Sequence, residues 1–171
     1  FSPYSPTMTA YKAWEAGLQT VGIMDHDSVA GCAEMLEAGK LFDIAATVGF
    51  EMRVNFSDTK VEGRRLNNPD SENLAYMAIH GIPRQRYGDA GTFLEPIQEA
   101  RNARNRAMVQ ELNQLISSWE IDRIDYERDV YEVSMAGEGG SITERHLMWA
   151  LSRKVVEKTG KGAQLVSFIR E

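Results

Sequence analysis

The residues best suited to chemistry in this 171-residue chain are three polar side chains that directly follow a short apolar run. Residues 21–24 read Val-Gly-Ile-Met, which is typical of a buried parallel strand, and Asp25, His26 and Asp27 come next. Open α/β sheets and α/β barrels place their chemistry at this end of a strand. A neutral imidazole binds divalent metals well when a carboxylate fixes its tautomer. His26 is therefore a candidate metal ligand, with Asp25 or Asp27 as its orienting partner or as a further ligand.

A simpler interpretation of this cluster stays open. Side chains alternate along an extended chain, so Asp25 and Asp27 would point away from His26. Asp27 and Ser28 could instead cap a helix over residues 29–40, which would leave His26 as a surface turn residue. Both interpretations predict the same local order of strand, polar loop and helix.

A second apolar run, residues 44–54, predicts the next parallel strand and carries Glu51 near its polar exit. Because the carboxyl ends of parallel strands meet at one edge, we expect His26 and Glu51 to converge. Two ligands fall short of the three or four that zinc sites take. His80 is the candidate for a third, since residues 75–83 read as another buried strand that ends at a turn. The alternative for His80 is a hydrogen-bonded histidine at a strand end.

The arginine that follows Glu51 is a candidate for substrate binding. A guanidinium group pairs well with phosphate oxygens, and Arg53 lies two residues after the predicted ligand. The polar segment of residues 55–72 adds Arg64 and Arg65, which are either further phosphate contacts or part of a solvated connection.

Taken together, these segments resemble the PHP (polymerase and histidinol phosphatase) family. Thr20 to Gly31 is similar to its second motif, a strand that ends in Asp-His-Asp before a helix. Ile44 to Arg53 is similar to the next strand, which ends in a metal-binding Glu at the place of Glu51. The resemblance covers about residues 1–83. It implies a distorted (β/α)7 barrel with a site for two or three metal ions that hydrolyses phosphate esters, with His26 among the ligands.

The chain departs from the family pattern at both ends. Family members begin with a strand that bears His-x-His, which has no counterpart here, and Phe1 falls near the place of an Asp ligand. The later motifs, a His and a closing Asp-x-His, have no counterpart after Pro83. The length is also too short for a closed barrel together with a helical second half. We therefore predict an α/β fold in which a partial PHP-type barrel, residues 1–83, is followed by a helical insertion, residues 84–171, in an incomplete chain.

Helical patterns dominate the second half. Residues 92–117 predict a long helix, and residues 121–135 fit a helix or irregular structure. A further helix is expected after Ser141-Ile-Thr-Glu144, which has capping-box spacing, and Thr143-Glu-Arg-His-Leu lies at its start. This start resembles the Arg-x-His opening of the family's helical insertion, and the N–H groups of a helix N-terminus favour anions. Arg145 and His146 are therefore candidate substrate contacts. An ordinary surface pair is the alternative.

Composition narrows the function classes. A net charge of -6 and a pI near 5.2 argue against non-specific nucleic-acid binding, which needs many lysines and arginines. No apolar run reaches the ~18 residues of a membrane span. The single cysteine, Cys32, can form no internal disulfide, and we expect a cytoplasmic protein.

Two functions remain in play. The first is metal-dependent hydrolysis of a phosphorylated small molecule, with zinc, manganese or iron as cofactor and with catalytic roles for Asp25 and Asp27. The second is a noncatalytic PHP-like structural or regulatory module with a degenerate metal site. Since an incomplete sheet exposes a strand edge and apolar surface, we expect missing sequence or a second copy of the chain to cover it.

Overall fold

The computed structural model describes residues 4–170, which divide into two compact units. One unit extends to Leu94 and the other begins at Glu95, so the division falls inside the long helix α3 (Tyr87–Ile116). The sequence places the division at Pro83. Each unit has a hydrophobic core of its own.

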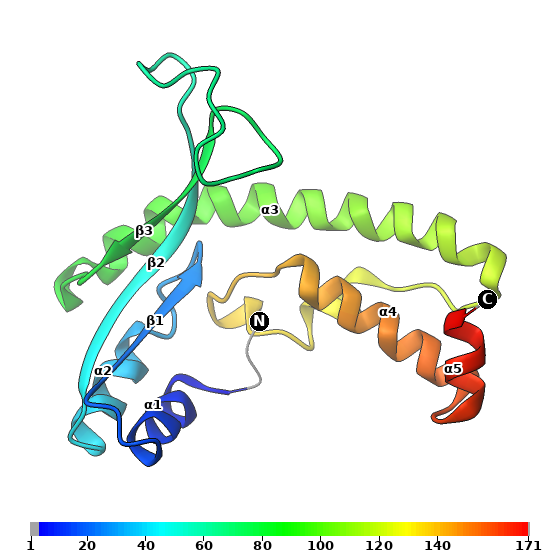
Figure 1. Ribbon diagram of the computed structural model, residues 1–171, viewed down its shortest axis with the longest axis horizontal. Coiled ribbons are helices and arrows are strands. Elements are labelled where there is room, and N and C mark those ends of the chain that lie inside the picture. Colours follow the sequence, from blue (N-terminus) through cyan, green and yellow to red (C-terminus); the bar gives the residue numbers. More distant parts are fainter. Residues whose placement is uncertain (1–3, 171) are drawn as a thin grey trace. The chain divides into compact units, whose positions relative to one another are not determined.

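The first unit is a small mixed α/β structure (Figure 1). Its described elements are α1 (Pro6–Glu15), β1 (Thr20–His26), α2 (Cys32–Leu41), β2 (Ala45–Asn55) and β3 (Leu74–His80), followed by a short 3-10 helix (Arg84–Arg86). The strands form one sheet in the order β1-β2-β3. β1 and β2 are parallel, as predicted, and β3 is antiparallel to β2. The described residues thus form a mixed α/β unit with a three-stranded sheet, and its origin as part of a (β/α)7 barrel stays a prediction.

The core of this unit lies between one face of the sheet and the two helices. Ala10 of α1 and Met35 of α2 are fully buried, and they meet Val48 of β2. Ile23 is the register partner of Val48 and lies on the same face. Side chains alternate along a strand, so the neighbouring positions on β1 and β2 belong to the opposite face. That opposite face carries His26 and Glu51.

The starts of α1 and α2 are formed in different ways, and the start of α2 differs from the sequence prediction. Ser5 caps α1, because its hydroxyl accepts a hydrogen bond from the Met8 N–H at 3.1 Å. The helix predicted from Val29 begins instead at Cys32, and Gly31 occupies its cap position. Ser28 therefore does not cap α2; its hydroxyl accepts from the Ala30 N–H within the preceding turn.

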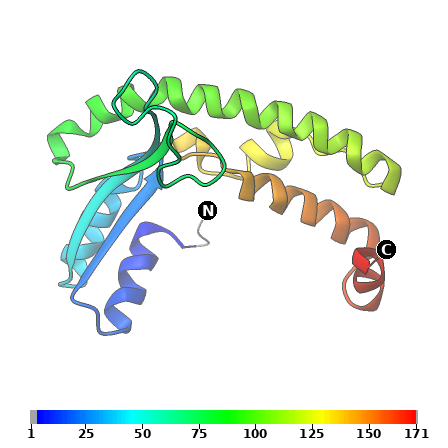
Figure 2. The same ribbon diagram turned by 45° about the horizontal axis from the view of Figure 1, so that its top comes forward.

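β3 is largely exposed rather than buried, because it lies at the edge of the sheet. The long loop of residues 56–73 connects it to β2 and extends past the ends of both strands (Figures 1 and 2). β1 lies at the other edge. Within residues 4–170 neither outer edge has a further strand partner. What covers these edges stays a prediction.

The second unit is helical. Its described elements are the greater part of α3, α4 (Glu144–Thr159), α5 (Ala163–Arg170), short 3-10 helices at Ser117–Trp119 and Ala136–Glu138, and a π-helical turn at Glu127–Tyr131. The core is apolar, with Val130, Ile142 and Leu147 buried. Asn113 of α3 ties down the irregular segment after the helix, since its amide both donates to and accepts from the backbone of Ile124 at 2.8 Å.

Among residues 4–170, no helix combines the length and the apolar character needed to cross a bilayer.

Candidate metal centre

His26 and Glu51 come together as predicted, where β1 ends against β2, although β2 continues beyond Glu51 to Asn55. They are register partners on β1 and β2, and Nδ1 of His26 lies 2.9 Å from Oε1 of Glu51. Both side chains are partly exposed. At this distance Nδ1 donates to the carboxylate, so a neutral His26 keeps a lone pair on Nε2. This is the arrangement in which a carboxylate orients a metal-binding histidine.

The two aspartates beside His26 do not share its place. Asp25 lies on the face of the sheet that is covered by the helices. One of its carboxylate oxygens is 3.5 Å from the position that a Cβ atom at Gly31 would occupy. Burial and the nearby charge of Asp25 together raise the pKa of the Cys32 thiol to about 11. Asp27 is fully buried with a left-handed backbone, φ 50°, and its N–H donates to the Glu51 carbonyl at 2.8 Å. The orienting role that the sequence suggests for Asp25 or Asp27 is taken by Glu51.

His80 lies on the same face of the sheet as Glu51. Ala78 is the register partner of Glu51, and His80 is two residues further along β3, opposite Gly49. The side chain is exposed. Within residues 4–170, no group of three His, Cys, Asp or Glu side chains is arranged to hold a metal ion, so the structure does not bring His80 into the His26–Glu51 pair.

Arg53 and Tyr76 extend the polar face from Glu51 across to β3. They are register partners, and an Nη atom of Arg53 donates to the Tyr76 hydroxyl at 2.9 Å. The guanidinium carbon of Arg53 lies 5.3 Å from the centre of the Tyr76 ring. The ring centres of Tyr76 and His26 are 6.4 Å apart. Arg53 therefore belongs to the same cluster as His26 and Glu51, as its candidate substrate role requires.

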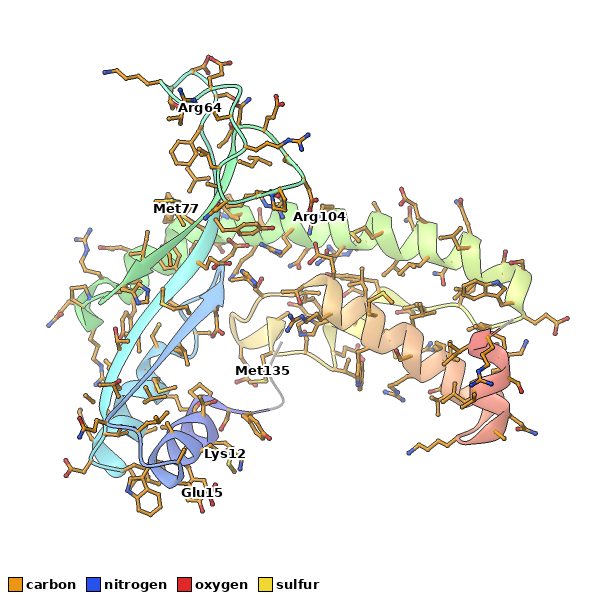
Figure 3. All side chains as sticks on the ribbon, viewed as in Figure 1. Lys12, Glu15, Arg64, Met77, Arg104 and Met135 are labelled. Atoms are coloured by element: carbon orange, nitrogen blue, oxygen red, sulfur yellow. The ribbon has the colours of Figure 1, made fainter. Side chains whose placement is uncertain are left out.

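Sequence reasoning missed Tyr76. The signal was alternation: Tyr76, Ala78 and His80 share one face of the strand, and only antiparallel pairing with β2 places Tyr76 opposite Arg53. The loop residues Arg64 and Arg65 are exposed, and Figure 3 shows Arg64 in the loop beyond the strands.

Arg145 and His146 lie in the first turn of α4, in the second unit. Arg145 is exposed. The capping box at this helix start is formed by Thr143 and His146 and not by Ser141 and Glu144, whose spacing suggested one, because Nδ1 of His146 accepts a hydrogen bond from the Thr143 N–H at 3.0 Å. Burial lowers the pKa of His146 below its ordinary value of 6.5. The geometry gives His146 a structural role, and substrate contact by either residue stays a prediction.

The capping role makes the stability of the protein depend on pH. The pKa of His146 is lower in the folded than in the unfolded protein, so its contribution is present above pH 6.5 and is lost as the pH falls. Protonation of Nδ1 would also remove the acceptor for the Thr143 N–H. Glutamine at this position accepts the same bond without titrating. We expect the free energy of unfolding, measured in urea at pH 8 and pH 5, to fall less for His146→Gln than for the wild type. Equal losses in the two proteins would contradict this role.

Comparisons with known proteins bear on the fold. No protein-family model and no curated protein matches the chain. Among solved structures, a Bifidobacterium adolescentis protein provisionally described as a metal-dependent phosphoesterase matches with a TM-score of 0.59 and 19% identity, over 94% of this chain and 52% of its own. An amidohydrolase from Chromobacterium violaceum, solved with bound sulfate and no metal, matches with a TM-score of 0.59 and 18% identity, over 98% of this chain and 49% of its own. The chain thus spans about half the length of these two proteins and shares the α/β fold of that half.

Proposed function

We propose that this protein takes part in the metal-dependent hydrolysis of a phosphate ester, with a PHP-type site at the point where β1 ends beside Glu51 of β2. The observation that carries the proposal is the contact between His26 Nδ1 and Glu51 Oε1, which leaves Nε2 of His26 available as a ligand. The two structural neighbours, one described as a metal-dependent phosphoesterase and the other as an amidohydrolase, support a hydrolase-type function. The substrate would be a phosphorylated small molecule.

The donor atoms of His26 and Glu51 are of the kinds that bind divalent metals, but two residues are fewer than a metal site usually has. Imidazole nitrogen and carboxylate oxygen are ligands that zinc, manganese and iron accept. The pair would supply His26 alone, with Glu51 orienting it, or both residues as ligands. Either way the remaining positions would be filled by other donors, for which His80 stays a proposal.

The chain's own residues would have distinct tasks. When bound, divalent ions polarise the phosphate and lower the pKa of a water molecule. Glu51 would keep the proton of His26 on Nδ1, and Arg53 would hold a phosphate oxygen with its guanidinium group. Catalytic roles for Asp25 and Asp27 stay predictions and do not carry the proposal.

One of the two structural neighbours was solved with a tetrahedral anion. The amidohydrolase from Chromobacterium violaceum holds sulfate without metal. We propose that this chain likewise binds a tetrahedral oxyanion, with Arg53, two residues after Glu51 on the same face of β2, as a contact.

Removal and return of metal tests the proposal. Gently purified protein is expected to contain zinc, manganese or iron by elemental analysis, and to hydrolyse p-nitrophenyl phosphate. Dialysis against a chelator should abolish hydrolysis, and the same metal should restore it, because no side chain of the cluster replaces a metal's effect on water. Protein that holds no metal and gains no activity from any of the three would favour the noncatalytic module.

A further inference from the structure

Arg53 combines partial burial with the lack of an ion pair in the described part of the chain, whereas other arginines without one, such as Arg64 and Arg145, are exposed. Exposed arginines here commonly form ion pairs, as Arg84 does with Glu37 at 2.9 Å and Arg106 with Glu127 at 2.8 Å. Arg53 is less exposed, its Nε atom is buried without a hydrogen-bond partner, and its hydrogen bond goes to a neutral hydroxyl. In the part of the chain that the structure describes, no carboxylate forms an ion pair with it.

A cation withdrawn from water without an anionic partner is costly. The cost is smaller when an anion takes up the free N–H groups, because charge-assisted hydrogen bonds are the strong ones. Arg53 follows Glu51 on β2 with one residue between them, on the face that carries His26. The position and the missing counter-charge therefore point to an anion that comes from outside the described chain.

Tyr76 holds the guanidinium group of Arg53 in place. Its hydroxyl accepts from Arg53 at 2.9 Å, and its ring lies against the guanidinium carbon at 5.3 Å from the ring centre. The two contacts restrict an otherwise flexible side chain before any anion arrives. Such preorganisation lowers the entropy that binding would otherwise cost.

Tyr76 is itself fixed from the loop side by Asn67. The side-chain amide of Asn67 donates to the Tyr76 carbonyl at 2.7 Å and accepts from the Tyr76 N–H at 2.8 Å. Both backbone groups of Tyr76 therefore point to Asn67 rather than to β2. Arg53 and Tyr76 are thus a non-hydrogen-bonded cross-strand pair, the type whose side chains lie closest together.

We infer that Tyr76 is a positioning residue for Arg53, and that the two form a subsite for a tetrahedral oxyanion of the phosphate class beside His26 and Glu51. The identity of the anion rests on the proposed function, whereas the existence of the subsite rests on the contacts of Arg53 and Tyr76. Tyr76 acts through the guanidinium group and does not itself need to touch the substrate.

Inorganic phosphate, titrated calorimetrically into chelator-treated protein, is the direct probe. Arg53→Met should weaken phosphate binding by about 10-fold or more, the usual size of a hydrogen bond to a charged group. Tyr76→Phe keeps the ring and loses the hydroxyl, so a loss of about 2- to 10-fold is expected. Tyr76→Ala loses both contacts and should weaken binding further. A stepwise loss of phosphate affinity from Tyr76→Phe to Tyr76→Ala, with unchanged circular dichroism, would not be expected if Tyr76 only supported the fold.

Tyr11→Phe is the matched control. It removes a hydroxyl that contacts Glu15 at 3.3 Å on α1, and phosphate affinity should stay at the wild-type value. Phosphate binding that survives Arg53→Met would overturn the subsite. Wild-type affinity in both Tyr76 variants would overturn the positioning role.

Hydrolysis by the metal-loaded protein separates this inference from the proposed function. If both hold, Tyr76→Phe raises KM for p-nitrophenyl phosphate more than it lowers kcat, since it weakens anion binding. If the metal-loaded protein has no hydrolytic activity but the Arg53 and Tyr76 variants bind phosphate more weakly than the wild type, the subsite is supported and the proposed function is rejected. Hydrolysis with unchanged KM and unchanged phosphate affinity in the variants supports the function and rejects the subsite.

Discussion

His26→Ala is expected to leave the purified protein without bound metal and without phosphate-ester hydrolysis. One ring nitrogen of His26 contacts the Glu51 carboxylate, which leaves the other nitrogen to bind a metal ion. Metal-binding histidines are typically oriented by a carboxylate in this way. Because the His26 side chain is partly exposed, its loss should leave the fold intact. Metal content by elemental analysis and the initial rate with p-nitrophenyl phosphate are the two measurements.

Glu51→Gln tests how the pair divides its work. If Glu51 only orients His26, the amide oxygen still accepts from Nδ1, and metal affinity should fall by about 10- to 100-fold, the usual effect of losing an outer carboxylate. If Glu51 is itself a ligand, the loss should match that of His26→Ala. Glu62→Ala, which changes an exposed carboxylate in the loop, is the control and should keep wild-type metal content. Full metal content in His26→Ala would contradict the proposed site.

Gly49→Ala is expected to produce the largest loss of stability. A Cβ at Gly49 would overlap the carbonyl oxygen of Ile79 on β3 and would come within 2.7 Å of the Met24 sulfur. The overlapping atom is backbone, so β3 has to move away from β2 rather than a side chain turning aside. Overpacking of a core commonly costs about 1–3 kcal/mol, and here we expect about 3 kcal/mol or more of the free energy of unfolding, measured in urea.

Gly91→Ala is the matched control for this substitution. Gly91 lies inside α3, and an added Cβ meets no atom within 4 Å. Alanine favours a helix over glycine by up to about 1 kcal/mol, so this variant should be at least as stable as the wild type. A Gly49→Ala protein as stable as Gly91→Ala would show that the sheet accommodates a side chain at this point.

The parallel pair of strands could be predicted because its signals are local. Each run is apolar and ends in a polar residue, and parallel pairing then brings His26 and Glu51 to one edge. β3 could not be placed in this way, since its residues 74–80 carry no mark of strand direction. Antiparallel pairing after a long loop puts Tyr76, rather than His80, opposite Arg53.

The helix starts show a similar limit. Ser28 and Asp27 have the composition of a cap, yet Ser28 forms a local turn and Asp27 adopts a left-handed backbone. The backbone conformation of this turn depends on a contact distant in the sequence, because the Asp27 N–H donates to the carbonyl of Glu51 on β2. At the start of α4 the presence of a cap could be predicted because its partners lie within one turn, but the box is formed by Thr143 and His146 two residues after the Ser141–Glu144 spacing that suggested it.

The Asn67 amide has a consequence for self-association. An edge strand with free N–H and C=O groups is a template on which other chains can add a strand. By bonding to both backbone groups of Tyr76, Asn67 takes the place that a neighbouring strand would need. A one-residue deletion in the loop before Asn67 would withdraw this amide from β3, so the shortened protein should aggregate more readily than the wild type. Asn67, which fixes Tyr76 beside the candidate site, thus also hinders the addition of a strand from another chain at this point of β3.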